Sequence, residues 1–414
     1  MIGSAATARI ALDDEGRLEG VQPAPRRATR DAPDRGALDG VQIAVYTAIA
    51  DCEAVWRAAG AKCTGYVFQT FEWQAAYQAT IGQAEGVLPV IVLVSGRDGE
   101  PLLLLPLGIY RQGALRVLRF LGGAVTDYGA PLVAPGFTER FGADFAALWR
   151  AILDQMPPFD LVWLRRMPQT VEDEPNPLIS LGGATHTRDA YAAHVPATLD
   201  AFRTARSAKL FSDGRRQRRR LGEIAALTLE MPMADAAALD TVTAMVRQKS
   251  RRYTESGVPD IFARPGYREF YERLTEGPLR LDGVHVSRLC VGDTVVATHW
   301  GVLFRNRLYW LMPTYEGGEW QRFSCGRLLL ESAFEWCIAH GVKVLDLTVG
   351  DERYKLDWAD HSLALYEYRL PRSLKGAAYV GFQRARDGLK RNERLRGAAQ
   401  SLRALVRLKK PQRG

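Results

Sequence analysis

The sequence predicts an α/β fold built from two related domains with a helical segment between them. The main observation is a pattern that occurs twice: three strands joined by short turns, then a loop, a helix and a further strand. An internal repeat of this length is stronger evidence for a fold than any single motif within it. Hairpins followed by a helical crossover predict mixed sheets covered by helices, an α/β or α+β arrangement.

Composition agrees with a globular chain of two domains. The 414 residues are 47% hydrophobic and 25% charged, which is too apolar for wholesale disorder. The five cysteines show no CxxC or Cys/His metal spacing, so we expect a reduced cytoplasmic protein without a metal. No apolar run approaches the roughly 18 residues of a membrane-spanning helix, and we expect no signal peptide.

The repeat and the composition together divide the chain into successive segments. The predicted segments are a disordered leader at 1–40, an N-terminal domain at 41–195, a C-terminal domain at 196–372 with a helical insert at 198–275, and a basic amphipathic tail at 373–414.

The first copy opens with a strand at 41–46 and two helices at 49–59 and 72–81. Alternating apolar residues and Gly-containing turns then predict the repeated pattern. Its elements are strands at 88–94, 101–110 and 115–121, a Gly-rich loop at 122–136, a helix at 139–155 and a strand at 160–165.

The second copy follows a mainly helical stretch. Helical spacing predicts helices at 198–221, 234–256 and 265–274. The repeated elements are strands at 284–291, 294–304 and 307–313, a loop at 314–323, a helix at 326–340 and a strand at 343–348.

A short polar stretch before the helix of the second copy is the first candidate site. Ser324 suits an N-cap, and Gly326 lets the backbone approach a ligand closely. Free amides at a helix N-terminus suit a pyrophosphate. An ordinary capped helix is the alternative interpretation.

The strand and loop after this helix carry the second candidate site. Asp346 interrupts an apolar strand, and Asp351, Tyr354 and Lys355 follow it within one short loop. Such a loop places acid, base and cation together at a strand's carboxyl end. Alternatively, Asp351 caps a helix and the other two are solvated. His299 lies within a neighbouring strand. Two interpretations of this residue are open: a general base and a structural histidine.

These residues carry a resemblance to a known family. The stretch at 315–358 resembles the signature of CelD-like GNAT acyltransferases. This family has a tandem GNAT fold and is related to the Fem-like transferases. The similarity covers about residues 55–372. The matching positions are Tyr315, Ser324, Gly326, Leu328, Leu329, Gly341, Leu345, Asp346, Gly350, Asp351, Tyr354, Lys355 and Trp358.

The resemblance implies that the second copy holds acyl-CoA or acetyl-CoA as co-substrate. The thioester would lie along Leu311, Met312 and Thr314. The pyrophosphate would lie in the loop formed by Arg322, Ser324, Cys325, Gly326 and Arg327. This loop departs from the usual GNAT pattern of two glycines, because Cys325 stands between the flanking positions and only Gly326 is present.

The resemblance also suggests roles in direct acyl transfer to an amine. The base would be Asp346, Asp351 or His299, and Tyr354 would be the acid. Lys355 would hold Asp351 or an anionic substrate group. Substrate-binding candidates are Asp127 and Tyr128 in the first copy and Tyr315 and Trp358 in the second.

The C-terminal tail is strongly basic. From residue 372 onward there are thirteen Lys or Arg residues and two acidic ones, and a basic helix is predicted at 379–408. We expect an anionic surface such as the inner membrane, with a helix packed on the sheet as the alternative.

Three functions follow as hypotheses. The first is a cytoplasmic acyl-CoA-dependent N-acyltransferase acting on an amino sugar or lipid amine in envelope or exopolysaccharide synthesis. The second is a Fem-like transferase using aminoacyl-tRNA, and the basic helix at 203–220 is the feature that supports it. The third is a non-catalytic accessory protein of polysaccharide assembly. Other nucleic acids are not expected as partners.

Overall fold

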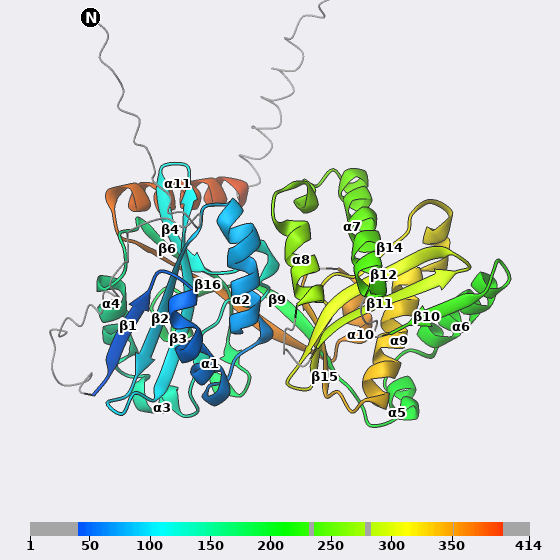
Figure 1. The fold of residues 1–414 in the computed structure, drawn as a ribbon, viewed down its shortest axis with the longest axis horizontal. Coiled ribbons are helices and arrows are strands. Elements are labelled where there is room, and N and C mark those ends of the chain that lie inside the picture. Colours follow the sequence, from blue (N-terminus) through cyan, green and yellow to red (C-terminus); the bar gives the residue numbers. More distant parts are fainter. Residues whose placement is uncertain (1–39, 232–235, 278–282, 351, 392–414) are drawn as a thin grey trace, which may run out of the picture.

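The computed structural model describes residues 40–231, 236–277, 283–350 and 352–391 (Figure 1). Their strands form one mixed sheet of fourteen strands that runs through both halves of the molecule. A separate hairpin pairs β7 (Thr170–Val171) with β8 (Glu174–Pro175). The predicted α/β class is therefore confirmed.

The first half contains the predicted strands and helices in the predicted order. β2 and β3 are buried over almost their whole length, which explains their nearly continuous apolar sequence. The strands are β1 (Gln42–Tyr46), β2 (Leu88–Ser95), β3 (Pro101–Gln112), β4 (Leu115–Phe120), β5 (Leu132–Val133) and β6 (Leu161–Pro168); the helices are α1 (Glu53–Lys62), α2 (Phe71–Tyr77), α3 (Phe137–Phe141) and α4 (Phe145–Asp154).

The second half repeats this order of elements. Its two helices between the first and second strands, α7 and α8, correspond to α1 and α2 of the first half. The elements are α5 (Leu199–Thr204), α6 (Ala208–Gly222), β10 (Leu227–Glu230), α7 (Ala236–Ser256), α8 (Tyr267–Glu276), β11 (Val284–Val291), β12 (Thr294–Phe304), β13 (Arg307–Tyr309), β14 (Thr314–Tyr315), α9 (Cys325–Ala339), β15 (Val344–Val349) and α10 (Tyr354–Trp358).

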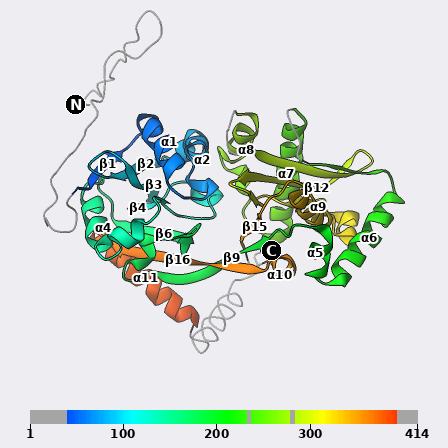
Figure 2. The same ribbon diagram turned by 90° about the horizontal axis from the view of Figure 1, so that it is seen from below.

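The two halves exchange their sixth strands. β9 (Thr185–His194) follows the first half in sequence but pairs with β15 of the second, and β16 (His361–Pro371) pairs with β6 of the first. The two exchanged strands also pair with each other, side by side at the junction (Figure 2). The sheet order is therefore β1-β2-β3-β4-β6-β16 in one half and β10-β11-β12-β13-β15-β9 in the other. The domain boundaries at 41–195 and 196–372 stay predictions.

Several elements differ from the predicted ones. The helix expected at 139–155 is two helices, α3 and α4, separated at residues 142–144, and the helix expected at 198–221 is α5 and α6. The strand expected at 307–313 ends at Tyr309, because beyond that point the chain leaves one of its two neighbouring strands.

The halves share a core of aromatic side chains. Trp73 of α2 lies edge-on to Phe270 of α8, with ring centroids 5.2 Å apart, and Tyr271 packs on Trp300 of β12 at 4.9 Å. Such pairs each contribute about 0.5–1.5 kcal/mol beyond the burial of their surface. A second core, which includes Phe202 and Phe334, lies on the α9 side of the sheet.

The tail begins as helix α11 (Leu374–Arg391), which packs against β4, β6 and β16. Tyr379 lies 6.2 Å from the ring of Trp163, and Val380 is buried with Val117, whereas Phe382 is 65% exposed. The leader at 1–39 and the rest of the predicted tail helix, 392–408, lie outside the described residues. Within the described part of the chain, no helix is long and apolar enough to cross a membrane.

Candidate functional site

The parallel strands β13 and β15 part after three residue pairs. Trp310 N still donates a hydrogen bond to Asp346 O at 2.8 Å, but Met312 N donates instead to Trp300 O of β12 at 2.9 Å. The chain therefore follows β12 and leaves β15. Between these two points, the N–H and C=O of Leu311 form no hydrogen bond with any described residue. We call this parting of the strands the fork.

A network of four side chains, two buried and two partly buried, occupies the closed end of the fork. Asp346 is 1% exposed, and its carboxylate accepts from Tyr128 Oη at 2.7 Å, Arg307 Nη1 at 3.1 Å and Thr348 N at 2.8 Å. Arg307 Nη2 also donates to Glu172 Oε2 at 3.3 Å. We call Tyr128, Glu172, Arg307 and Asp346 the junction network, since two come from each half of the chain.

The network brings together two residues that the sequence predicted for different roles. Asp346 was expected as a base and Tyr128 as a substrate-binding residue, and the structure places their side chains in direct contact. Sequence reasoning missed Arg307 and Glu172. A carboxylate that three donors hold in place is well suited to positioning its neighbours.

Asp127 lies beside the network and is bound to Arg166. Arg166 Nη1 donates to Asp127 Oδ1 at 3.0 Å and to Thr126 O at 2.8 Å. Burial raises the pKa of the Asp127 carboxyl, while Arg166, the Thr348 hydroxyl and Lys355 act in the opposite direction. Asp127 thus combines a raised pKa with a location next to the fork.

Two non-glycine residues near Asp127 have left-handed backbone conformations. Arg166 has φ 56° in β6 and Thr348 has φ 57° in β15, the corresponding strands of the two halves. Such conformations cost about 1–3 kcal/mol and concentrate at functional sites. The shared strain indicates that both halves shape this region.

Lys355 supports the loop after β15. Its side chain is almost fully buried and donates to Val349 O at 2.9 Å and Thr348 O at 3.3 Å, and it pairs with Glu352 at 3.2 Å. The partners of Lys355 in the structure are therefore backbone carbonyls and a carboxylate of the same loop. Asp351, its predicted partner, lies outside the described residues, so its role stays a prediction.

Lys249 of α7 is a further cationic residue near this loop, and the sequence analysis did not select it. Burial, together with the charges of Arg252 and Lys355, lowers the pKa of Lys249 to about 8, although Glu352 raises it. Among the described residues, Lys249 has no hydrogen-bond or ion-pair partner. An amine with this pKa exchanges protons near neutral pH.

Tyr354 also lies at this loop, where the sequence predicted the acid. Burial raises the pKa of its phenol, the charge of Glu352 raises it further, and Arg252 opposes them. The phenol therefore remains protonated at neutral pH, which an acid requires.

The N-terminus of α9 differs from the predicted cap. Ser324 stands at the predicted N-cap position, with φ 53° and ψ 44°, but its side chain makes no capping hydrogen bond. The Tyr315 ring covers Gly326 closely enough that a Cβ there would lie 2.9 Å from Tyr315 Cδ1. The Arg252 guanidinium in turn lies 4.4 Å from the centre of this ring.

The other predicted pyrophosphate residues have different surroundings. Arg322 is exposed and its guanidinium lies over the ring of Phe323 at 4.8 Å. Arg327 instead donates to Leu210 O of α6 at 3.3 Å. Burial raises the pKa of the Cys325 thiol to about 12, so this residue could offer only its backbone N–H to an anion. Arg322 is therefore the side chain best placed for a phosphate.

Two predicted residues lie away from the junction network. His299 is stacked on Trp310 with ring centroids 3.6 Å apart, on the face covered by α9, and burial lowers its pKa well below the usual value. Trp358 is 1% exposed and stacks on Phe334 in the second core. Both side chains therefore lie in the interior, apart from the junction network, and their catalytic and substrate-binding roles stay predictions.

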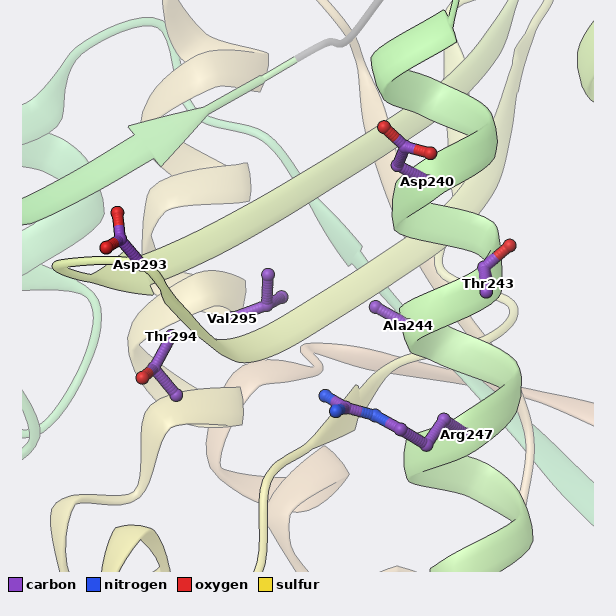
Figure 3. Close-up of a pocket in the computed structure, with 7 residues that line it drawn as sticks. All are labelled: Asp240, Thr243, Ala244, Arg247, Asp293, Thr294 and Val295. Carbon is purple, nitrogen blue, oxygen red and sulfur yellow. The ribbon is translucent and has the colours of Figure 1, made fainter.

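A pocket of about 440 Å³ lies elsewhere in the second half. Figure 3 shows its lining by Asp240 and Arg247 of α7 and by Asp293 in the turn between β11 and β12. Arg247 also pairs with Glu316 at 3.2 Å. None of the predicted site residues lines this pocket, so it is separate from the fork.

Comparison with known proteins agrees with this geometry. Residues 208–356 match the family model described as an acetyltransferase (GNAT) domain. This match covers less than half of the chain, and all of it lies in the second half. The matched region includes the fork, the N-terminus of α9 and Lys355, whereas Asp127, Tyr128 and Glu172 lie before it. No curated protein matches the sequence at a significant level.

A solved structure extends the likeness to both halves of the chain. The chain resembles the crystal structure of FemX, with 11% identity and a TM-score of 0.53 over 80% of this chain and 97% of that one. Two other similar structures are the C-terminal domain of a putative lysylphosphatidylglycerol synthetase from Agrobacterium fabrum (9% identity, 80% and 96% covered, TM-score 0.46) and a tandem GNAT protein from the clavulanic acid biosynthesis pathway (9%, 80% and 99%, 0.42). With the repeated sheet order and the family match of the second half, the likeness to FemX shows a tandem GNAT-like fold.

Proposed function

We propose that this chain is an acyl-CoA-dependent N-acyltransferase that acts on an amine. The observation that carries the proposal is the fork: Leu311 presents an unpaired backbone edge next to a buried polar network, within a matched GNAT domain. In the proposed reaction the amine nitrogen bonds to the thioester carbon, the carbon–sulfur bond breaks, and one proton moves from the amine toward the leaving thiolate.

The residues along the fork fit a thioester donor. Leu311, Met312 and Thr314 would line the acyl group and its amide-containing arm. Thr314 Oγ1 and Tyr309 Oη are buried, and neither has a hydrogen-bond partner in the described part of the chain. Orphaned buried hydroxyls of this kind are costly unless something binds them, so they support a ligand at the fork.

The donor's phosphates would lie at the start of α9. The first N–H groups of a helix lack partners within the helix and attract anions. Arg322 is the exposed cation there. The ring of Tyr315 over Gly326 would separate this phosphate region from the fork.

The amine would approach from the first half, between Asp127 and Lys249. Asp127 would bind the incoming ammonium, and Lys249, with a pKa of about 8, would accept its proton. Tyr354 would return a proton to the leaving thiolate. Asp346, Arg307 and Tyr128 would position these groups.

We further propose that the acceptor is an amino sugar or a lipid amine of envelope or exopolysaccharide synthesis. The basic tail supports an acceptor at the inner surface of an anionic membrane, because the tail has thirteen basic residues and only two acidic ones. The protein would then be cytoplasmic and peripheral.

A donor assay tests the reaction. Purified full-length protein is mixed with acetyl-CoA or palmitoyl-CoA and either glucosamine or phosphatidylethanolamine, and free thiol is measured together with thermal stability. We expect a CoA donor to raise the melting temperature and to release thiol only with an amine. Arg322→Ala should weaken donor binding severalfold, whereas Arg150→Ala, an exposed arginine on α4, should not.

Absence of both stabilisation and thiol release with every donor would reject this function and favour the non-catalytic accessory role. Donor binding without turnover would reject only the tested acceptors and lead to a wider set of amines.

A specific observation supports the aminoacyl-tRNA alternative. Helix α6 presents Arg215, Arg216 and Arg219 to solvent and packs against α9 and the turn before it. A row of exposed arginines suits a nucleic-acid backbone. If charged tRNA binds, Glu substitutions at these three positions should abolish the binding while leaving the response to CoA unchanged.

A further inference from the structure

A cluster of two histidines and one aspartate lies where the exchanged strands meet, away from the proposed acyl-transfer residues. His194 ends β9, while Asp360 immediately precedes β16 and His361 begins it. Their ligand atoms all lie within 4.8 Å of one another. His194 Nδ1 is 3.1 Å and His361 Nδ1 is 2.7 Å from the same oxygen, Asp360 Oδ1.

These distances match those between ligands of one metal ion. Ligand bonds of about 2.0–2.2 Å at tetrahedral or octahedral angles place neighbouring ligand atoms roughly 2.8–3.6 Å apart. The separations of 2.7 and 3.1 Å from Asp360 Oδ1 are close to this range, and the three side chains would rearrange around an ion from their present hydrogen-bonded positions.

The cluster is also held in position by the backbone. Both carboxylate oxygens of Asp360 accept from His194 N, at 3.0 and 3.1 Å, and Asp360 N donates to Ala192 O at 3.1 Å. The two imidazoles lie side by side with centroids 4.4 Å apart and their planes tilted by 35°. Preorganised ligands reduce the entropy lost on binding.

We propose that His194, Asp360 and His361 bind a divalent transition-metal ion, with Zn²⁺ as the reference ion. Two imidazoles and one carboxylate suit Zn²⁺, Co²⁺ or Ni²⁺ rather than Mg²⁺ or Ca²⁺, which prefer oxygen ligands. The His194 side chain is 73% exposed, so water completes the coordination.

A metal ion here would cross-link the two exchanged strands. It would join the end of β9 to the start of β16, the two strands that each half receives from the other. It would also fix the chain just after α10, because Ala359 N donates to Lys355 O at 2.8 Å. Metal binding would thus stabilise both the junction and the end of the Lys355 loop.

The strand β9 offers a matched control. His186 Nε2 lies 2.9 Å from Asp189 Oδ1, and both side chains are substantially exposed. This pair contains one histidine and one carboxylate, but no third ligand within the described residues. His186→Ala therefore removes a similar imidazole without touching the proposed site.

The test uses metal-free full-length protein and inorganic Zn²⁺ or Co²⁺ alone. Calorimetry should show one Zn²⁺ per chain, and Zn²⁺ should raise the melting temperature. His194→Ala and His361→Ala should each weaken binding at least tenfold, with His186→Ala unchanged.

Cobalt absorption separates this site from other ligands. Co²⁺ bound by nitrogen and oxygen should give visible bands without a thiolate charge-transfer band, because the five cysteines are buried thiols. Wild-type binding no tighter than that of His194→Ala, or a thiolate band, overturns the proposal. Because neither measurement uses acyl transfer, a negative result leaves the proposed function untouched.

Discussion

Asp346 joins the two halves of the molecule at a single carboxylate, and its environment explains what replacing it should do. The Asp346→Asn variant keeps the volume but removes the buried charge that faces the partly buried Arg307 side chain. Breaking a buried ion pair from one side costs roughly 3–5 kcal/mol. We expect a loss of this order in the free energy of unfolding, measured by urea denaturation, and little remaining activity.

Tyr128→Phe is the milder test of the same network. It removes one hydrogen bond to Asp346 and should cost about 1–2 kcal/mol, because bonds to charged groups exceed neutral ones. If it lowered stability as much as Asp346→Asn, the ion pair with Arg307 would not be the main interaction of this carboxylate.

Lys249 gives a prediction of pH dependence. Its folded pKa of about 8 lies below the usual 10.5, so above pH 8 the folded chain releases this proton before the unfolded chain does. The unfolded state then binds more protons, and the contribution of Lys249 to stability rises with pH between about 8 and 10.5.

Lys249→Met should remove that rise, which denaturant titrations at pH 7 and 10 measure as a difference from wild type. It should also abolish the increase of transfer rate with pH near 8. Lys343→Met, at an exposed lysine before β15, should change neither property. An unchanged rate profile in Lys249→Met would exclude Lys249 as the proton acceptor.

The sequence identified only part of these residues. Asp346 and Lys355 were found because a charge at the end of an apolar strand, or within a distinctive motif, is visible locally. Arg307 and Glu172 were missed because their partners lie 39 and 135 residues away, and neither interrupts a pattern. The role of His299 stays a prediction, because a buried histidine in a strand has the same sequence signal as a base.

At the scale of elements, the loop between β15 and α10 depends on Gly350. Its φ of 148° is rarely accessible to other residues, and a Cβ there would lie 2.6 Å from Lys355 Nζ. We expect Gly350→Ala to displace Lys355 and lower the transfer rate at least tenfold, measured by thiol release. Gly341→Ala should cost stability through its φ of 69° but spare the rate, since nothing lies near its Cβ. Equal rates in both variants would contradict this role of the loop.

Helix α11 provides a test of membrane association. Its inner side packs on the sheet, but Phe382 remains exposed on a basic segment. We expect the full chain to sediment with phosphatidylglycerol vesicles at low salt and to dissociate at high salt. Phe382→Ser and truncation after Arg391 should each reduce binding without changing the melting temperature. Retention of binding after both changes would exclude the tail as the contact.

Elements with strong local patterns were predicted closely. The hairpin β11–β12 has the predicted bounds, because alternating apolar residues and the turn at Gly292–Asp293 determine it. Helix breaks were missed, since the breaks within 139–155 and 198–221 depend on packing. The end of β13 was also missed, because it depends on the hydrogen bonds of two neighbouring strands rather than on its own residues.

At the scale of the whole molecule, the repeat was visible in the sequence but the strand exchange was not. β9 pairs with a strand about 150 residues later in the chain, and β16 pairs with one about 200 residues earlier. Local periodicity carries no information about such pairings. The exchange also explains how residues of both halves meet around Asp346, because it fixes β6 and β15 in one sheet.

The exchange predicts that neither half folds by itself. A fragment of residues 40–195 would lack β16, and residues 196–391 would lack β9, so each would expose the edge of a buried strand and part of the shared aromatic core. We expect each fragment alone to be aggregated or without a cooperative thermal transition by circular dichroism. Mixing the two during refolding should restore one. A protease site inserted at exposed Ala197 is the control, because cleavage of the folded chain there retains all strands and should preserve the transition. Cooperative unfolding of either fragment alone would show that the exchanged strands are dispensable, and that the halves are independent domains.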